Sequence, residues 1–169
     1  VTGSVQLQLR DLSELTFLTE LDVGNCGLSE LPEAIGCLTS LRRLNAAKNP
    51  LRDLPATLGQ CRELTILFFL GCDFEEVPVV LGTLPVLYML SFKGNKLRHV
   101  AETALAPSIG WLILSDNELR VLPRSIGRLK GLRKCMLAGN QLESLPPELA
   151  LGCRELELIR LADNKLLDL

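Results

Sequence analysis

The stretch LTILFFLGCDF, residues 64–74, decides the fold because it is apolar on two alternating sets of positions. In an extended strand, Leu67 and Phe69 point to one side of the sheet, and Ile66 and Phe68 point to the other. In a sheet with one face toward water, a strand is usually apolar on its buried face and polar on its solvated face. The period of the whole chain is needed to tell which set is buried and why the second set is apolar as well.

The same leucine-led pattern recurs along the chain in seven segments. Successive segments begin 22 to 24 residues apart, so one phase is kept over most of the sequence. A fixed period of this length indicates a stacked repeat architecture. The segments are LTELDVGNCGL from Leu18, LRRLNAAKNPL from Leu41, LTILFFLGCDF from Leu64, LYMLSFKGNKL from Leu87, IGWLILSDNEL from Ile109, LRKCMLAGNQL from Leu132 and LELIRLADNKL from Leu156.

These segments resemble the leucine-rich repeat family, whose pattern is L-x-x-L-x-L-x-x-N/C-x-L. The linking halves LPEAIGCLTS, LPATLGQCRE, VPVVLGTLPV and LPRSIGRLKG are similar to the intracellular LPxxIGxL subclass of plant and animal Ras-pathway scaffolds. Segments such as WLILSDN also resemble repeat regions that accompany protein kinases, although the chain has no kinase motif. The resemblance covers residues 12–169 and implies a non-catalytic module that binds protein partners.

Residue types within each unit predict an α/β fold, a right-handed solenoid or horseshoe with a parallel concave sheet. If the first leucine of a unit is position 1, positions 4 and 6 point inward and positions 3, 5 and 7 point outward. Position 9 holds Asn or Cys, and we expect this side chain to satisfy backbone groups of neighbouring coils. Leu-Pro at positions 14 and 15 starts a return limb, which is predicted to form turns and short 3₁₀ pieces.

The domain organisation predicted from this pattern has two parts. Residues 1–17 form an N-terminal cap, and residues 18–169 form the seven repeats. No C-terminal cap is visible, so we expect either that the sequence is a piece of a longer protein or that its open end binds a second copy. The segment HVAETALAPSIG lacks the Leu-Pro step and should give a different convex limb.

Composition argues against several classes of partner. The formal net charge is -2, which does not suggest a nucleic-acid binder, and no apolar run is long enough to span a membrane. No cofactor-binding motif or metal-ligand cluster is present, so no cofactor is predicted. The repeat template explains all six cysteines: Cys26 and Cys72 take position 9, Cys135 takes an inward position, and Cys37, Cys61 and Cys153 take inward-tending positions on the return limbs.

Those cysteine positions predict six reduced thiols and a cytoplasmic location.

Residues suited to catalysis are few. His99 is the single histidine and is expected to be an exposed turn residue. Asp73, Glu75 and Glu76 straddle a turn at the rim of the sheet, where carboxylates usually face solvent. The chain is therefore not predicted to be an enzyme.

Outward positions of the predicted sheet carry the candidate site. They are polar in the first two units but turn apolar from the third unit on, and an exposed apolar patch of this kind usually marks an interaction surface. The alternatives are that these side chains pack against one another, that a flanking segment covers them, or that the chain associates with itself. A regulatory segment of a larger signalling enzyme is the second functional interpretation. The predicted partner-binding residues are Ile66, Phe68, Leu70, Met89, Trp111, Ile113, Met136 and Leu158.

Overall fold

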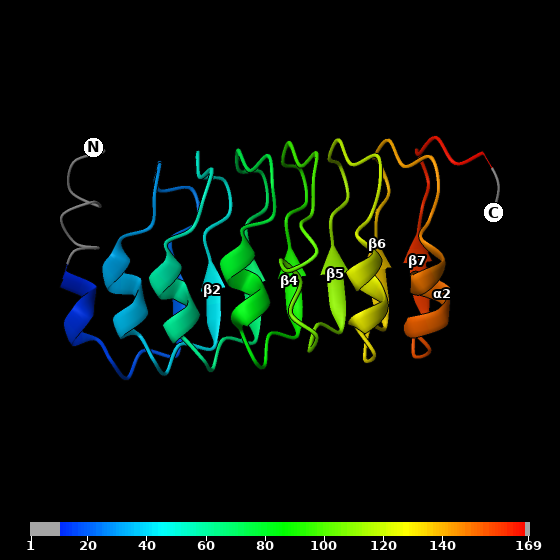
Figure 1. Ribbon diagram of the computed structural model, residues 1–169. Coiled ribbons are helices and arrows are strands. Elements are labelled where there is room, and N and C mark those ends of the chain that lie inside the picture. Colours follow the sequence, from blue (N-terminus) through cyan, green and yellow to red (C-terminus); the bar gives the residue numbers. More distant parts are fainter. Residues whose placement is uncertain (1–10, 168–169) are drawn as a thin grey trace.

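The computed structural model describes residues 11–167, and most of the predicted N-terminal cap lies outside this range. Seven parallel strands of three residues each form one open sheet in chain order, as the repeat pattern predicts. Figure 1 shows the seven coils stacked side by side from the N-terminal to the C-terminal end. The strands are β1 (Glu20–Asp22), β2 (Arg43–Asn45), β3 (Ile66–Phe68), β4 (Met89–Ser91), β5 (Trp111–Ile113), β6 (Lys134–Met136) and β7 (Leu158–Arg160).

Return limbs cover the side of the coils opposite the sheet (Figure 1). Proline precedes five of their short helices in an extended or nearly extended conformation, where its missing N–H group costs nothing. This confirms the predicted 3₁₀ pieces and single helical turns. The helices are η1 (Asp11–Glu14), η2 (Glu33–Cys37), η3 (Ala56–Gln60), η4 (Val79–Thr83), η5 (Arg124–Arg128) and α2 (Pro147–Gly152).

The fourth return limb differs from its neighbours, as the missing Leu-Pro step predicts. Between β4 and β5 the chain forms turns but no helix. Glu102 in this limb accepts hydrogen bonds from the backbone N–H groups of Arg124 (3.0 Å) and Ser125 (2.7 Å). Its carboxylate therefore caps the start of η5 in the next coil and joins the irregular limb to a regular one.

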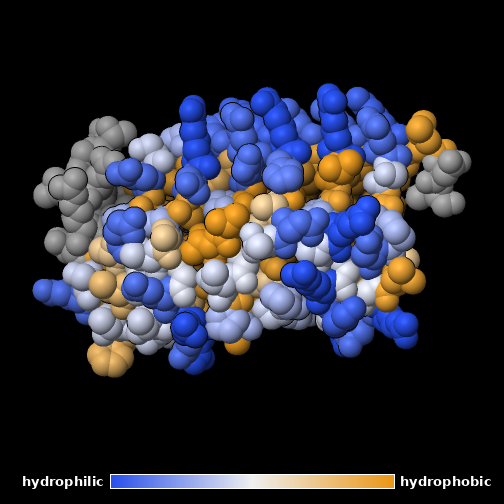
Figure 2. Space-filling view, viewed as in Figure 1, coloured by the Kyte–Doolittle hydropathy of each residue, from blue (hydrophilic) through white to orange (hydrophobic). Residues whose placement is uncertain are grey.

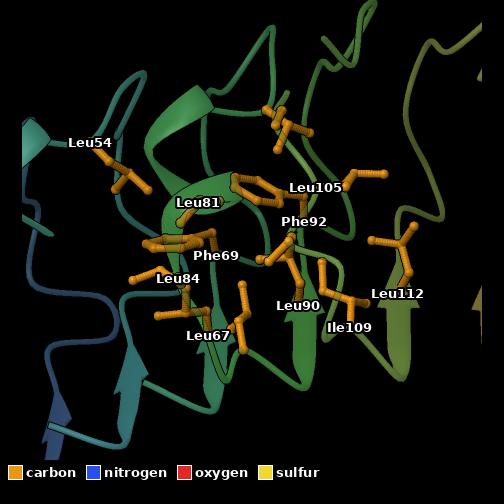
Figure 3. Packing of buried hydrophobic residues seen from close by; sticks show 14 of the residues in the cluster. Leu54, Leu67, Phe69, Leu81, Leu84, Leu90, Phe92, Leu105, Ile109 and Leu112 are labelled. Atoms are coloured by element: carbon orange, nitrogen blue, oxygen red, sulfur yellow. The ribbon is translucent and has the colours of Figure 1, made fainter. Parts of the chain in front are cut away.

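Inward positions 4 and 6 form the core between the sheet and the return limbs (Figure 3). Leu67 and Phe69 are 0% exposed, which confirms the predicted register of β3. Phe69 stacks on Phe92 at 5.2 Å between ring centroids, and Phe74 meets both rings edge-on. A slip of one residue would expose Leu67 and Phe69, so the core leaves β3 a single register.

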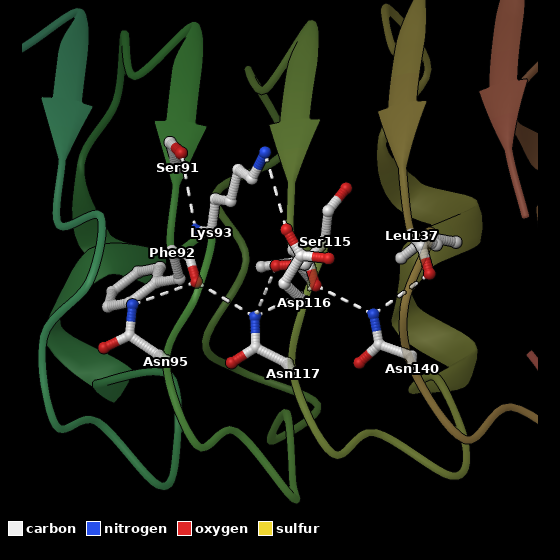
Figure 4. Close-up of polar contacts among 10 residues, drawn as sticks. Ser91, Phe92, Lys93, Asn95, Ser115, Asp116, Asn117, Leu137 and Asn140 are labelled. Atoms are coloured by element: carbon white, nitrogen blue, oxygen red, sulfur yellow. Dashed lines mark hydrogen bonds and ion pairs between the residues drawn. The ribbon is translucent and has the colours of Figure 1, made fainter. Parts of the chain in front are cut away.

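The position-9 asparagines connect successive coils, as Figure 4 shows. Asn117 donates from Nδ2 to the carbonyl oxygens of Phe92 (2.9 Å) and Leu114 (3.0 Å), and its Oδ1 accepts the N–H group of Leu97. The N–H group of Leu97 has no other partner within residues 11–167, and each of the two carbonyl oxygens also accepts a second amide, from Asn95 and Asn140. The thiol of Cys72 occupies the same slot but makes only long contacts, such as 3.4 Å to the oxygen of Ala46. The predicted role of position 9 is therefore confirmed.

One cysteine prediction is wrong. Cys37 is exposed instead of pointing inward. It is the last residue of η2, and its neighbours Ile35 and Leu38 already fill the inward positions of that turn. Burial raises the pKa of the Cys61 thiol to about 11 and that of Cys135 to about 12, so both are protonated near neutral pH.

The two ends of the stack are less covered than its middle. In the seventh coil the inward residues Ile159 and Leu161 are only partly buried, whereas Leu112 in the fifth coil is 0% exposed. At the other end, η1 packs against η2 and buries Leu12, but Phe17 is 90% exposed. Within residues 11–167 the inner coils thus have a neighbouring coil on both sides, and the first and seventh coils have a neighbouring coil on one side.

Candidate partner-binding surface

The outward side chains of the sheet fall into columns, because equivalent residues of successive strands lie opposite one another. Position 3 aligns Ile66 with Met89, Met89 with Trp111, and Trp111 with Lys134. Position 5 aligns Phe68, Ser91, Ile113 and Met136 in the same way. We call the eight predicted partner-binding residues the apolar wall: Ile66, Phe68, Leu70, Met89, Trp111, Ile113, Met136 and Leu158.

Seven of the eight residues of the apolar wall lie at outward positions of β3 to β7, Leu70 follows β3, and all eight are half-buried. Strands about 4.8 Å apart bring the side chains of one column into contact, so each side chain covers part of the next. Ser91 lies between Phe68 and Ile113 and is only 1% exposed, because these larger neighbours cover it. The apolar wall is therefore a continuous surface, and part of its apolar area is buried within the wall itself.

Two cations lie on the aromatic rings of the apolar wall. The guanidinium carbon of Arg43 is 5.4 Å from the ring centroid of Phe68, and Nζ of Lys134 is 3.9 Å from that of Trp111. The negative faces of the rings attract both cations. Within residues 11–167 neither cation forms an ion pair, although Arg43 lies close enough to Asp22 to help lower the pKa of that carboxyl.

Tyr88 extends the apolar surface and was missed in the sequence-based prediction. It is 44% exposed at position 2 of the fourth unit, next to Met89 of the apolar wall. Its ring lies against the backbone of Gly110, where a side chain at position 110 would collide with it. The signal in the sequence was the single tyrosine of the chain, followed by glycine at the same position of the next unit.

The carboxylates considered for catalysis lie on the rim of the sheet in ion pairs. Asp73 contacts Nζ of Lys96 at 2.6 Å, and this contact holds the pKa of Asp73 below its usual value. Glu75 pairs with Arg98 at 3.5 Å, and Glu76 and His99 are exposed. Figure 2 views the molecule from the return-limb side and shows hydrophilic side chains along the edge formed by the turns after the strands. These residues behave as a solvated, ion-paired edge.

Within the described part of the chain, no three metal-ligating side chains gather in one place. No helix between residues 11 and 167 has the length and the apolar character needed to cross a bilayer.

Comparisons with known proteins agree with this architecture. The sequence profile of the family described as Leucine Rich Repeat matches residues 17–38. The chain is 34% identical over 134 residues to the volume-regulated anion channel subunit LRRC8E of Homo sapiens, covering 78% of this chain and 14% of that subunit. It is 32% identical over 149 residues to TMV resistance protein N of Nicotiana glutinosa, covering 82% of this chain and 13% of that protein. The chain thus spans about one seventh of the length of either relative.

Solved structures show the same arrangement of coils. A leucine-rich-repeat protein of Leptospira interrogans superposes with a TM-score of 0.71 at 28% identity, covering 94% of this chain and 46% of that one. A chain of the Drosophila Toll–Spatzle complex superposes with a TM-score of 0.83 at 23% identity, covering 92% of this chain and 22% of that one. The second likeness concerns the fold alone.

Proposed function

Since the chain is a leucine-rich-repeat protein, we propose that it is a non-catalytic module that binds a protein or peptide partner on its concave sheet. The observation that carries this proposal is the apolar wall. Eight large apolar side chains line one solvent-facing surface in register, while the core beneath them is already complete. Tryptophan, methionine and phenylalanine on such a surface are typical of binding hot spots.

Packing within the apolar wall does not remove this argument. Half-burial leaves part of each side chain in contact with water, and the cost of that exposure is recovered when a partner covers the wall. The outward residues of β1 and β2 show that the same backbone accepts charged and polar side chains at these positions. The apolar residues on β3 to β6 are therefore better explained by contact with a partner than by the needs of the fold.

A second candidate function is a regulatory repeat segment of a larger signalling protein. The matching regions of two relatives make up only 14% and 13% of a channel subunit and a resistance protein. In both interpretations the repeats bind through their surface.

We further propose that the module works inside the cell, as expected for the LPxxIGxL subclass. The buried cysteines support this location, because Cys61, Cys72, Cys135 and Cys153 are free thiols at positions that the repeat template already explains. Burial raises the pKa of each of these thiols and favours the uncharged form. Alkylation of the unfolded chain without reductant should add six labels, and any thiol that reacts only after reduction would contradict the proposal.

The test of the binding face is a partner capture with matched charge variants. Phe68→Glu combined with Ile113→Glu places two charges in the apolar wall. Val79→Glu combined with Val121→Glu places the same two charges on exposed apolar residues of the return-limb side, each 59% exposed. A partner of the concave sheet should be lost from the first variant and retained by the second.

The size of the loss follows from hot-spot energetics. A central aromatic side chain often contributes about 2 kcal/mol or more to binding, so two such losses should lower affinity by more than about a hundredfold. If the wall variant folds and retains all of its partners, the concave sheet is not the binding face. Light scattering against concentration would show whether the captured partner is a second copy of this chain.

A further inference from the structure

We propose that the partner presents an extended segment with apolar side chains between two carboxylates, a pattern of the form acid-x-apolar-x-apolar-x-acid. This inference rests on the proposed function and adds the chemical class of the ligand. It is carried by Arg43 and Lys134, two cations that lie on rings of the apolar wall and form no ion pair within residues 11–167.

Arg43 and Lys134 bracket the apolar part of the position-3 column. Arg43 lies on β2 beside Ile66, and Lys134 lies on β6 beside Trp111. Met89 lies between Ile66 and Trp111, so three apolar side chains separate the two cations. A ligand that crosses the strands along this column meets a cation, then an apolar surface, then a second cation.

Both cations are placed to receive a carboxylate. Lys93, by contrast, is already paired with Asp116 at 3.4 Å. Lys134 is half-buried on the ring of Trp111, and its strand neighbours at position 3 are Trp111 and Leu158, which carry no charge. Contact with the rings of Phe68 and Trp111 restricts both cations, so a carboxylate that binds there loses less side-chain entropy than at a free lysine or arginine.

Acidic groups on the concave sheet are concentrated at its N-terminal end. Glu20 lies opposite Arg43 on β1 but forms no ion pair with it in the structure. Asp22 already accepts hydrogen bonds from Gly24 (2.9 Å) and from the Asn45 amide (3.0 Å), which lower its pKa. These carboxylates lie beyond the cation at that end and leave the path between Arg43 and Lys134 free of negative charge.

The strands that carry the two cations set the outer limit for the spacing of the acids, because both charged groups lean over the apolar wall onto the rings of Phe68 and Trp111. The backbones of Arg43 and Lys134 are four strands apart, which is about 19 Å at the usual separation of about 4.8 Å. An extended peptide rises about 3.3 Å per residue, so six steps cover about 20 Å. Alternate residues of that peptide face the sheet, which gives an acid, two apolar side chains and a second acid on the contacting side.

A protein segment fits better than a single-stranded nucleic acid. A nucleic-acid strand needs a continuous cationic groove along its phosphates, in addition to aromatic platforms. Here the cations lie at the edges of an apolar surface, and the chain has a formal net charge of -2. Carboxylates at two defined positions match this arrangement, and a charge at every nucleotide does not.

The experiment measures binding of labelled peptides by fluorescence anisotropy. The probe is Asp-Thr-Leu-Thr-Leu-Thr-Glu, compared with the same peptide carrying Lys at both ends, with Asn and Gln at both ends, and with acids only three residues apart. The protein variants are Lys134→Glu, Arg43→Glu, the Phe68→Glu and Ile113→Glu double variant, and Arg62→Glu as a control at an exposed turn residue before β3.

We expect the acidic probe to bind more tightly than the other peptides, and more weakly as salt is added. Lys134→Glu and Arg43→Glu should each lower its affinity about tenfold or more, whereas Arg62→Glu should change it little. Lys134→Glu should in turn bind the Lys-ended peptide more tightly than the unmodified protein does. This reversal is a gain of binding, which an unfolded variant could not produce.

Each contrary result overturns a defined part of the account. If the Asn and Gln peptide binds as well as the acidic probe, and only the double variant loses it, the acidic class is wrong and the binding face stands. If the acidic probe binds regardless of the double variant, the proposed binding face itself is wrong. Failure of the acidic probe to bind, tighter binding of a single-stranded oligonucleotide, or self-association that the probe does not compete with would each overturn the inference.

Discussion

The first two strands of the sheet and the next three share one core but differ on the solvent side. Leu44 in β2 and Leu67 in β3 are both 0% exposed, and both lie in the same inward column. On the outward side, β2 carries Arg43 and Asn45, whereas β3 carries Ile66 and Phe68 at the same positions. The backbone and the core therefore accept either polar or apolar side chains at the outward positions.

This difference separates residues that specify the fold from residues that are free to serve another purpose. An outward apolar side chain on β3 gains some contact with its column neighbours. The polar side chain at the same position of β2 lacks that apolar contact, and β2 still forms the same kind of strand. The inward residues have no such freedom, because the interior is close-packed and a cavity is costly.

The inward and outward residues of β3 should differ most in their effect on stability. Leu67→Ala removes a fully buried side chain and should lower the free energy of unfolding by about 2–5 kcal/mol. Ile66→Ala, its neighbour in the half-buried column, should cost less than about 1.5 kcal/mol. Urea unfolding of both variants measures the difference, and equal losses would show that both faces of β3 belong to the core.

The position-9 residues should also differ in their effect on stability, according to the hydrogen bonds that they make. Asn117→Ala leaves the N–H group of Leu97 without a partner and removes one of two amide donors from the carbonyls of Phe92 and Leu114, so it should cost about 1–3 kcal/mol. Cys72→Ala, which removes a thiol with only long contacts, should cost on the order of 1 kcal/mol. Comparable unfolding midpoints for the two variants would show that the amide bonds contribute little.

Position in the stack should affect local stability. The N–H groups of Met89 in β4 and Leu158 in β7 each donate to a carbonyl of the preceding coil, at 2.9 Å and 3.0 Å. The seventh coil is only partly covered, so the amide of Leu158 should exchange with solvent at least about tenfold faster. Native-state hydrogen exchange resolves both sites, and equal protection would mean that a second copy or another partner covers the seventh coil.

Acid should weaken the contact between the irregular fourth limb and η5. The N–H groups of Ser125 and Arg124 hold the pKa of Glu102 below its ordinary value of 4.5. A lowered pKa stabilises the folded state above the ordinary value, and this contribution is lost as pH falls through the lower folded-state pKa. The urea concentration at the unfolding midpoint should therefore decrease as the pH drops below about 4.5. This decrease should be less steep in Glu102→Gln.

The control for this titration is Glu143→Gln. Within residues 11–167 the Glu143 carboxylate forms no hydrogen bond or ion pair, so its replacement should leave the pH profile unchanged. A profile for Glu102→Gln that matches the unmodified protein would show that other carboxylates, such as Asp22 and Asp73, account for the acid sensitivity.

The fold could be predicted from the sequence because its period is repeated seven times. Each unit repeats the same inward leucines, the same position-9 residue and, in most units, the same Leu-Pro step, so an error in one unit is corrected by the others. The prediction placed Cys37 on the inward side of the coil. Cys37 is the last residue of the five-residue helix η2, where adjacent side chains point in different directions. Local geometry of that kind is not contained in the repeat pattern.

The candidate surface was only partly predictable. The outward phase of Phe68 and Trp111 follows from the alternation within a strand, and the structure places both residues as predicted. The cations on their rings depend on long, flexible side chains of neighbouring coils, and Tyr88 depends on the absence of a side chain at Gly110. These contacts join residues more than 20 positions apart and become visible only when the coils are stacked.

The central claim is that the apolar wall is dispensable for folding. The most direct test is the free energy of unfolding of the Phe68→Glu and Ile113→Glu double variant, measured beside Leu67→Glu. The account predicts that the double variant unfolds cooperatively with a loss of less than about 2 kcal/mol, because these half-buried side chains can turn a charge toward water. Leu67→Glu places an unpaired charge in the core and should leave the chain unfolded. If the double variant is unfolded as well, the residues of the apolar wall belong to the core and the claim is wrong.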